Sequence, residues 1–247
     1  MDFKNKQYHS LLDKGVAIAE GGNPEGAIEF FQQAGGLFPE RSTPYSFIAN
    51  ALADLERHSE AIDFYDKAIE ILAKPYYLYN KANSLVSLGR LDDAIEYYGK
   101  ATNLNPAFGS AHFNKANVLK EQGRADEALA AYNQAIDASP DHSGAHYNKA
   151  KLLHNLEFNN EAIASFEKAI VLDPANGDIY YDLGIVFYVQ RQLEQAVHYF
   201  GKSIELNPTD LDAHYNYGMV LTKLGRMNEA QLSFNKYRTV QSEKMGD

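Results

Sequence analysis

The 247-residue chain contains no cysteine. This absence excludes disulfide bonds, a thiol nucleophile and thiolate metal sites, and it is typical of a reducing compartment. No apolar run is long enough to span a membrane, since the longest strongly apolar stretch is residues 185–189. Residues 1–15 lack the apolar core and cleavage site of a signal peptide. We therefore expect a cytoplasmic protein with no membrane partner.

Basic residues are scarce: 23 Lys and Arg stand against 33 Asp and Glu, for a formal net charge of −10. Nucleic-acid binding depends on clustered Lys and Arg that neutralise phosphates, so we expect no nucleic-acid partner. The chain also lacks a glycine-rich phosphate loop and the H-E-x-x-H and G-x-S-x-G motifs. We expect no enzyme, no catalytic residues and no cofactor.

A strict repeat runs through the chain instead. Alanines recur at intervals of 33 or 34 residues, and an aromatic residue follows each one after four residues. The alanines are Ala27, Ala61, Ala94, Ala128, Ala162, Ala196 and Ala230; the aromatics are Phe31, Tyr65, Tyr98, Tyr132, Phe166, Phe200 and Phe234. This period indicates a stack of similar units that bury their apolar faces against their neighbours, and such stacks usually bind rather than catalyse.

Each alanine can be counted as position 20 of a unit that holds two helical patterns. The first pattern has a small residue at position 8, and small residues at positions 8 and 20 allow the two helices to approach closely. Gly22, Gly89, Gly123 and Gly225 lie between the patterns, where a left-handed residue ends the first helix. The predicted segments are an N-terminal extension 1–7, a repeat array 8–244 made of 8–41, 42–74, 75–108, 109–142, 143–176, 177–210 and 211–244, and a tail 245–247.

These positions resemble the tetratricopeptide repeat, a 34-residue pattern with a small residue at position 8, alanine at 20, an aromatic at 24 and proline at 32. The resemblance covers residues 8–244. It implies an all-α fold, an α-solenoid in which seven antiparallel helix pairs form a right-handed superhelix. It also implies a concave groove, lined mainly by the first helix of each pair.

Two departures from the pattern lead to expectations. Position 7, usually a large aliphatic residue, is lysine in four units, and we expect the stems to lie along the helix with the ammonium in water. These lysines are Lys14, Lys81, Lys115 and Lys149. In the last unit, Gln231, Tyr237 and Arg238 stand at positions that are normally apolar or small, which predicts a polar outer face that ends the stack.

Histidine recurs at position 4 in His112, His146 and His214. These residues are at least one repeat apart, too far to share a zinc ion comfortably. His142 and His146 have i, i+4 spacing, but no third ligand accompanies them. We expect histidines that pack in the core, and no metal site.

Asparagine recurs on the face of the first helices opposite their packing face, although it is a poor residue for a helix interior. It occupies position 6 or 9 in most units, and an aromatic residue occupies position 5 in the last five. The candidate peptide-binding residues are Asn50, Asn80, Asn83, Asn114, Asn117, Asn148, Asp182, Asn216, Tyr79, Phe113, Tyr147, Tyr181 and Tyr215.

A side-chain amide can pair with both groups of a peptide unit. Equivalent helices lie about 10 Å apart and an extended chain advances about 3.3 Å per residue, so each repeat could hold about every third residue of a bound segment. The column resembles the groove ladder of O-linked N-acetylglucosamine transferase repeats. It does not resemble the chaperone carboxylate clamp, because it lacks lysine at position 2 and arginine at position 6. Alternatively, these side chains cap helices or bond to neighbouring repeats.

Asp182, together with Asp178 and Asp212, predicts an acidic C-terminal half of the groove. Taken together, the sequence predicts a non-catalytic scaffold that binds an extended or helical segment of another protein, as a monomer or weak homo-oligomer. Two alternatives stay open: a self-associating structural protein, and a subunit that recruits substrate to a separate enzyme.

Overall fold

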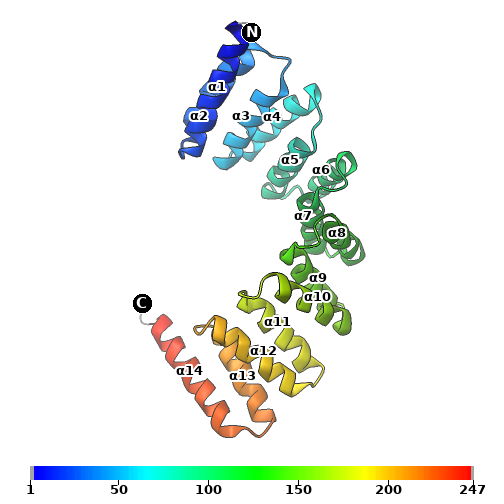
Figure 1. The fold of residues 1–247 in the computed structure, drawn as a ribbon, viewed down its shortest axis with the longest axis vertical. Coiled ribbons are helices and arrows are strands. Elements are labelled where there is room, and N and C mark those ends of the chain that lie inside the picture. The colour runs from blue at the N-terminus through cyan, green and yellow to red at the C-terminus, as the bar shows by residue number, and fades with distance from the viewer. Residues whose placement is uncertain (1–2, 246–247) are drawn as a thin grey trace. The chain divides into compact units, whose positions relative to one another are not determined.

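The structure is a computed structural model that describes residues 3–245, and in that range it contains fourteen helices and no strand (Figure 1). The helices are α1 (Phe3–Glu20), α2 (Pro24–Leu37), α3 (Ser42–Asp54), α4 (His58–Ile71), α5 (Pro75–Ser87), α6 (Leu91–Leu104), α7 (Gly109–Glu121) and α8 (Ala125–Ala138). They continue as α9 (Ser143–Asn155), α10 (Asn159–Leu172), α11 (Gly177–Val189), α12 (Leu193–Leu206), α13 (Leu211–Lys223) and α14 (Met227–Met245). None of these helices is both long and apolar enough to span a membrane.

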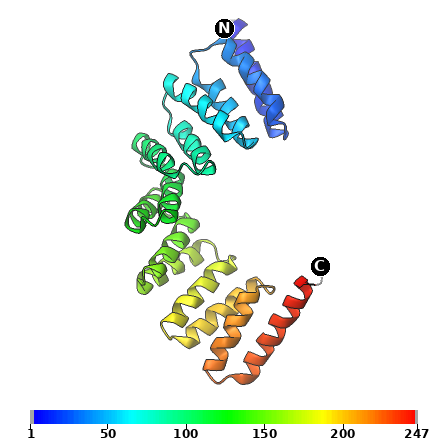
Figure 2. The same ribbon diagram turned by 180° about the vertical axis from the view of Figure 1, so that it is seen from behind.

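The helices form two compact units, Met1–Ser139 and Pro140–Asp247. Within the first unit α1 to α8 pack in chain order, each helix against the next, and within the second unit α9 to α14 do the same. Figures 1 and 2 show that the two helices of each pair run in opposite directions and are joined by short turns. The all-α solenoid of antiparallel helix pairs that the repeat predicts is confirmed.

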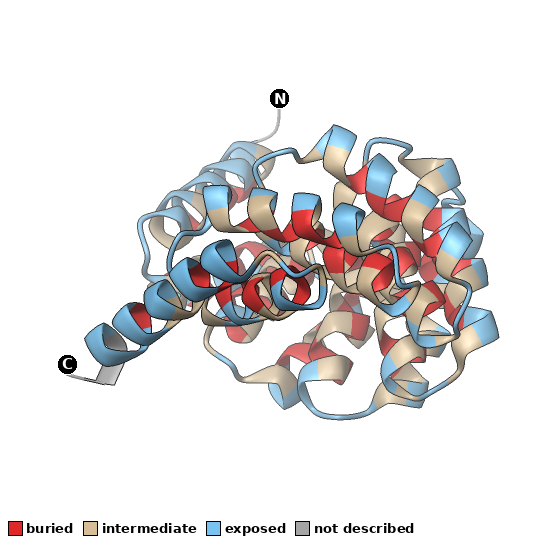
Figure 3. Cartoon of the chain, turned by 90° about the horizontal axis from the view of Figure 1, so that it is seen from below, coloured by how far each residue is buried: buried red, intermediate tan, exposed pale blue. Residues whose placement is uncertain are grey.

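The alanines and aromatics that define the repeat form the core of each pair. Six of the seven alanines have no exposed surface, and Ala230 is 2% exposed. Gly184 and Gly218 at position 8 face the aromatic at position 24: a Cβ atom on Gly184 would lie 2.8 Å from Cδ1 of Phe200. The small residue is therefore required by close packing, and Figure 3 shows buried residues on the faces that paired helices turn toward each other.

The turn inside each pair needs one residue in the left-handed region. Gly22, Gly89, Gly123 and Gly225 have φ between 71° and 84°, as predicted. The other three turns have φ between 59° and 65° at residues that carry a side chain: Glu56, Glu157 and Arg191. These three turns are strained, because a Cβ atom disfavours positive φ.

In three helix pairs the histidine at position 4 contacts the connection that precedes the pair. The Nε2 atoms of His112, His146 and His214 lie 3.0, 3.1 and 3.0 Å from carbonyl oxygens of the prolines six residues earlier. His112 and His214 are buried and His146 is partly exposed. These histidines thus act in packing, as expected, and they also satisfy backbone carbonyl groups. The described residues contain no group of three side chains that could hold a metal ion.

Lys81 contradicts the expectation that its ammonium lies in water. Its side chain is only 6% exposed, and Nζ forms an ion pair with Asp66 of α4. Nζ also donates a hydrogen bond to the Tyr97 hydroxyl of α6 at 2.9 Å and lies 4.0 Å from the centre of that ring. The sequence pattern alone could not show that neighbouring helices supply these partners. Lys14 is exposed, as predicted.

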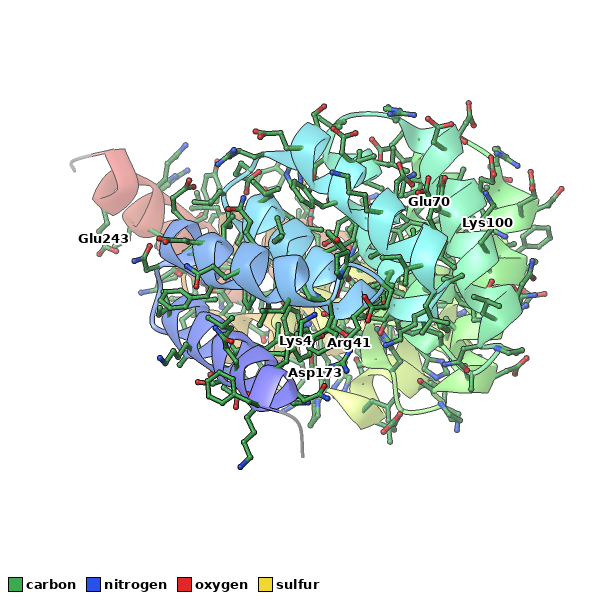
Figure 4. The ribbon with its side chains drawn as sticks, turned by 90° about the horizontal axis from the view of Figure 1, so that it is seen from above. Lys4, Arg41, Glu70, Lys100, Asp173 and Glu243 are labelled. Carbon is green, nitrogen blue, oxygen red and sulfur yellow. The ribbon has the colours of Figure 1, made fainter. Side chains whose placement is uncertain are left out.

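The helices at the two ends of the array extend beyond the predicted repeat boundaries. Residues 3–7 of the predicted extension belong to α1, and α14 ends at Met245, whereas residues 1–2 and 246–247 lie outside the described residues. Arg41 holds α1 in place: its guanidinium lies 4.0 Å from the ring centre of Phe38 and donates to Asn5 Oδ1 at 2.7 Å. Lys4 lies over the same ring, and Figure 4 shows Lys4 and Arg41 close together.

The outer face of α14 is polar at Gln231 and Arg238, which are both exposed. Tyr237 does not belong to that face, and its assignment there is wrong. Its ring packs against the ring of Tyr215 with 5.7 Å between their centres.

Candidate functional site

The asparagines at position 9 occur only in the first unit, where each accepts a hydrogen bond from the tyrosine at position 24 of the same pair. The distances from the tyrosine hydroxyl to Oδ1 are 2.7 Å for Asn50, 2.5 Å for Asn83 and 2.6 Å for Asn117. Tyr65 and Tyr98 are almost fully buried. Burial raises the pKa of both phenols well above its usual range.

The asparagines at position 6 connect one helix pair to the preceding one. Asn80 Nδ2 donates to Asn50 Oδ1 at 3.0 Å. Asn114 Nδ2 donates to Asn83 Oδ1 at 3.2 Å and to the Tyr79 hydroxyl at 3.1 Å. The Oδ1 atoms of Asn50 and Asn83 thus accept two hydrogen bonds each. We call Asn50, Asn80, Asn83, Asn114 and Asn117 the asparagine ladder.

The aromatics at position 5 pack within their own helix pair. Each ring lies 5.7–6.1 Å from the ring at position 24, tilted by 52–59°. Tyr79, Phe113, Tyr147 and Tyr181 are partly buried, while Tyr215 is 46% exposed. The aromatics at position 5 therefore pack the first helix of each pair against the second, and only part of each ring faces outward.

The second unit has a different arrangement at the same positions. Tyr147 donates to Asp182 Oδ2 at 2.7 Å, and Lys151 Nζ lies 3.1 Å from the same oxygen. Burial raises the pKa of the Tyr147 phenol, and the hydrogen bond to Asp182 adds to this effect. Because Lys151 pairs with Asp182, the acidic character expected at that residue is offset. Asn216 Nδ2 donates to the Tyr181 hydroxyl at 2.8 Å.

Two hollows lie along the asparagine ladder and meet at Asn83. The first has a volume of about 440 Å³ and is lined by Asn50, Asn80 and Asn83 among others. The second, of about 280 Å³, is lined by Asn83, Asn114 and Asn117. The second unit has a smaller hollow of about 70 Å³ beside Tyr215 and Asn216. The five predicted asparagines of the first unit thus line one polar track, whereas the predicted Tyr79 and Phe113 are not among its lining residues.

The ladder leaves some amide atoms available for a ligand. Asn83 Nδ2, a donor, makes no hydrogen bond with residues 3–245. The acceptors Asn80 Oδ1 and Asn114 Oδ1 likewise have no donor within that range. A donor and an acceptor are what a peptide unit needs, because it presents one C=O and one N–H group.

Sequence reasoning did not identify the tyrosines at position 24 as part of this site. The signal was present: units with asparagine at position 9 have tyrosine at 24, as in Asn50 with Tyr65. Units without it have phenylalanine, as in Val16 with Phe31 and Met219 with Phe234. A hydroxyl that appears only opposite an amide indicates a hydrogen bond between them.

Comparison with known proteins agrees with the helix geometry. Family models described as tetratricopeptide repeat match residues 43–72, 79–143, 113–178, 177–210 and 199–232. No curated protein matches the chain.

Solved structures of repeat proteins share the fold. The C-terminal part of a TPR repeat-containing protein from Cytophaga hutchinsonii has a TM-score of 0.81 at 15% identity and covers 93% of this chain and 95% of its own. A tetratricopeptide repeat protein from Parabacteroides merdae ATCC 43184 has a TM-score of 0.67 at 16% identity, with coverage of 95% and 93%. YrrB, described as a TPR protein with an unusual peptide-binding site, has a TM-score of 0.65 at 24% identity, with coverage of 74% and 95%.

Proposed function

The chain belongs to the tetratricopeptide repeat family, and we propose that it is a non-catalytic scaffold that binds an extended or helical segment of another protein along its first helices. Repeat arrays of this kind bind partners on the long surfaces that their stacked helices create. A cytoplasmic location and the absence of a nucleic-acid partner are part of the proposal, and they rest on composition and charge. YrrB is one protein of this fold whose description names a peptide-binding site.

The observation that carries the proposal is the polar track along the asparagine ladder. Two hollows share Asn83, and the amide atoms left over in them are one donor and two acceptors. A buried or half-buried amide without a partner costs free energy, and a bound peptide backbone would remove that cost. The track therefore favours a peptide over an apolar ligand.

The hydrogen bonds within the asparagine ladder hold its side chains in place before a ligand binds. Asn83 is held by Tyr98 and Asn114, so its Nδ2 atom already points away from both partners before a ligand arrives. In this arrangement Nδ2 of Asn83 donates to a ligand carbonyl and Oδ1 of Asn114 accepts from a ligand N–H group. Binding then loses little side-chain entropy, because the amides are ordered in advance.

The test uses a variant whose new residues already occur at the equivalent positions of another repeat in this chain. Asn83→Met with Tyr98→Phe reproduces the Met219 and Phe234 pair found at the same positions in the second unit. It removes the free Nδ2 donor and leaves an apolar pair in place of the hydrogen bond. Asn133→Ala is the matched control, since Asn133 is an exposed asparagine on α8.

The intact protein is used to capture partners, which are identified by mass spectrometry, and the affinity of each partner is then measured for all three proteins. We expect the double variant to bind about tenfold more weakly or worse. It loses the neutral hydrogen bond from Asn83 Nδ2 to the ligand and the polar contact surface around it. The Asn133→Ala variant should bind as the unchanged protein does. Equal affinity in the double variant, with helicity intact by circular dichroism, would refute the ladder as the binding surface.

A further inference from the structure

The two hollows of the first unit each contain a carboxylate that has no partner. Asp54 lines the first hollow and Glu121 lines the second. Both side chains are exposed, and neither forms an ion pair or hydrogen bond with any residue in the range 3–245. Both occupy position 13 of their repeats, two repeats apart. In contrast, Glu60 forms an ion pair with Arg57.

Among the described residues, no lysine or arginine lines either hollow, and His58, which lines the first hollow with Asp54, lies 3.0 Å from Glu56 Oε2 through its Nε2 atom. Positions 2, 6, 9 and 13 of the four repeats between residues 8 and 142 contain no lysine or arginine. In the first repeat they contain Asp13 and Glu20, and Lys6 and Lys14 line the same hollow as Asp13. The two hollows along the asparagine ladder are therefore negatively charged, and they attract a positively charged ligand.

The walls of the hollows fit the rest of a basic side chain. Tyr76, which is 46% exposed, lines the first hollow with Asp54. An aromatic face beside a carboxylate suits a guanidinium or ammonium group, because the ring attracts the cation that the carboxylate neutralises. Val86 and Val118 line the second hollow with Glu121, and they offer an apolar surface to the aliphatic stem of lysine or arginine.

From this arrangement we infer that the segment held by the first unit is an extended peptide with two basic residues, one paired with Asp54 and the other with Glu121. The inference rests on the proposed function and specifies the partner's chemistry. Two repeats advance about 20 Å, and an extended chain covers that distance in about six residues. The basic residues are therefore about six positions apart, with the backbone between them on Asn83 and Asn114.

The experiment selects ligands from a phage-displayed library of random twelve-residue peptides on the intact protein. The same selection is made on a variant with Asp54→Asn and Glu121→Gln. The matched control carries Asp63→Asn and Asp126→Asn, which remove two exposed carboxylates from the second helices α4 and α8 and change the net charge equally. Selected peptides are synthesised, and their affinities are measured by fluorescence polarisation at low and high salt.

The unchanged protein and the control should enrich peptides with Lys or Arg about six positions apart. These peptides should bind the Asp54→Asn and Glu121→Gln variant roughly three- to tenfold more weakly, because two exposed ion pairs are lost. Their affinity should also fall with salt concentration.

Two other results are possible and each has a distinct meaning. If selected peptides lose affinity for the Asn83→Met, Tyr98→Phe variant but show no basic enrichment, or bind the carboxylate variant unchanged, the inference is overturned and the proposed function stands. If no peptide is selected, or if all selected peptides bind the Asn83→Met, Tyr98→Phe variant equally well, the inference and the ladder surface are both overturned.

Discussion

The first and second units use the same helix packing but different chemistry on their first helices. In both, a small residue at position 8 meets the aromatic at 24, and the ring at position 5 packs on that aromatic. Only the first unit adds asparagine at position 9 and the tyrosine hydroxyl that bonds to it. The second unit has Lys151, Ile185 and Met219 there, each with phenylalanine at 24.

This difference shows that the asparagine ladder is not needed to build a helix pair. Helix pairs of the second unit form with Phe166 and Phe200 at position 24, and both rings are fully buried. A polar network inside a protein is costly when incomplete and gains little net stability when complete. In the first unit it connects neighbouring pairs through Asn80 and Asn114, and the proposed function gives it a second role in the polar track of the two hollows.

The largest effect should come from breaking one rung of the ladder. Asn83→Ala leaves the Tyr98 hydroxyl buried without its acceptor and removes one acceptor from Asn114, so we expect a loss of about 2–3 kcal/mol in the free energy of unfolding. Adding Tyr98→Phe removes the stranded hydroxyl and should restore about 1–2 kcal/mol. Urea unfolding of the four proteins in this double-mutant cycle measures the coupling. Additive effects would show that the two side chains do not depend on each other.

A smaller effect should appear at alkaline pH, where tyrosines ionise in the unfolded chain before the buried tyrosines of the first unit do. Because the pKa values of Tyr65 and Tyr98 are raised in the folded state, the fold favours their neutral form. The stability from this preference is fully present below about pH 10, the usual tyrosine pKa, and is lost as pH rises toward the raised values.

The check is the urea midpoint from about pH 9 to about pH 12, one unit below to two units above the usual tyrosine pKa, compared for the unchanged protein and for Tyr65→Phe with Tyr98→Phe. The variant should lose less stability over this range, although it starts from a lower value because two hydrogen bonds are absent. A pH dependence equal to that of the unchanged protein would contradict the role assigned to these phenols.

The smallest effect concerns the turns, where the two units differ in their use of glycine. The first unit has glycine at three of its four strained turn positions, whereas the second has Glu157, Arg191 and Gly225. Glu157→Gly should raise the free energy of unfolding by up to about 1 kcal/mol, because glycine adopts positive φ without steric cost. Gly123→Ala should lower it by about 1 kcal/mol. Thermal unfolding of both variants tests the pair, and the opposite sign in either one would contradict the explanation.

The repeat pattern was sufficient to predict the helix pairs, the left-handed glycines and the packing role of the histidines. Each of these follows from contacts within about one repeat, which the spacing of residues records directly. The pattern also located the asparagines on one face. It did not predict that Asn50 and Asn83 would each accept two hydrogen bonds, because one donor comes from the next repeat and its reach depends on the packed distance between helices.

Lys81 and Asp182 illustrate the same limit. Both carry charges on first helices, and the sequence places each at a position that suits a solvated side chain. In the folded protein Lys81 is buried against Asp66 and Tyr97, and Asp182 is paired with Lys151 and Tyr147. Each of these four partners lies 15 or more residues away in the chain. The environment of a charge depends on neighbours that only packing brings near.

The sequence by itself determined the fold family, where each helix falls within its repeat and which residues share one face of the first helices. These features depend on local spacing and side-chain size. Only the tertiary structure decided which polar atoms of that face are already satisfied and which are free. Hydrogen bonds require atoms within about 3.5 Å, and that distance is set by how neighbouring pairs pack rather than by the repeat period. The donor of Asn83, the amide oxygens of Asn80 and Asn114, and the carboxylates of Asp54 and Glu121 are among the groups that packing leaves open within residues 3–245.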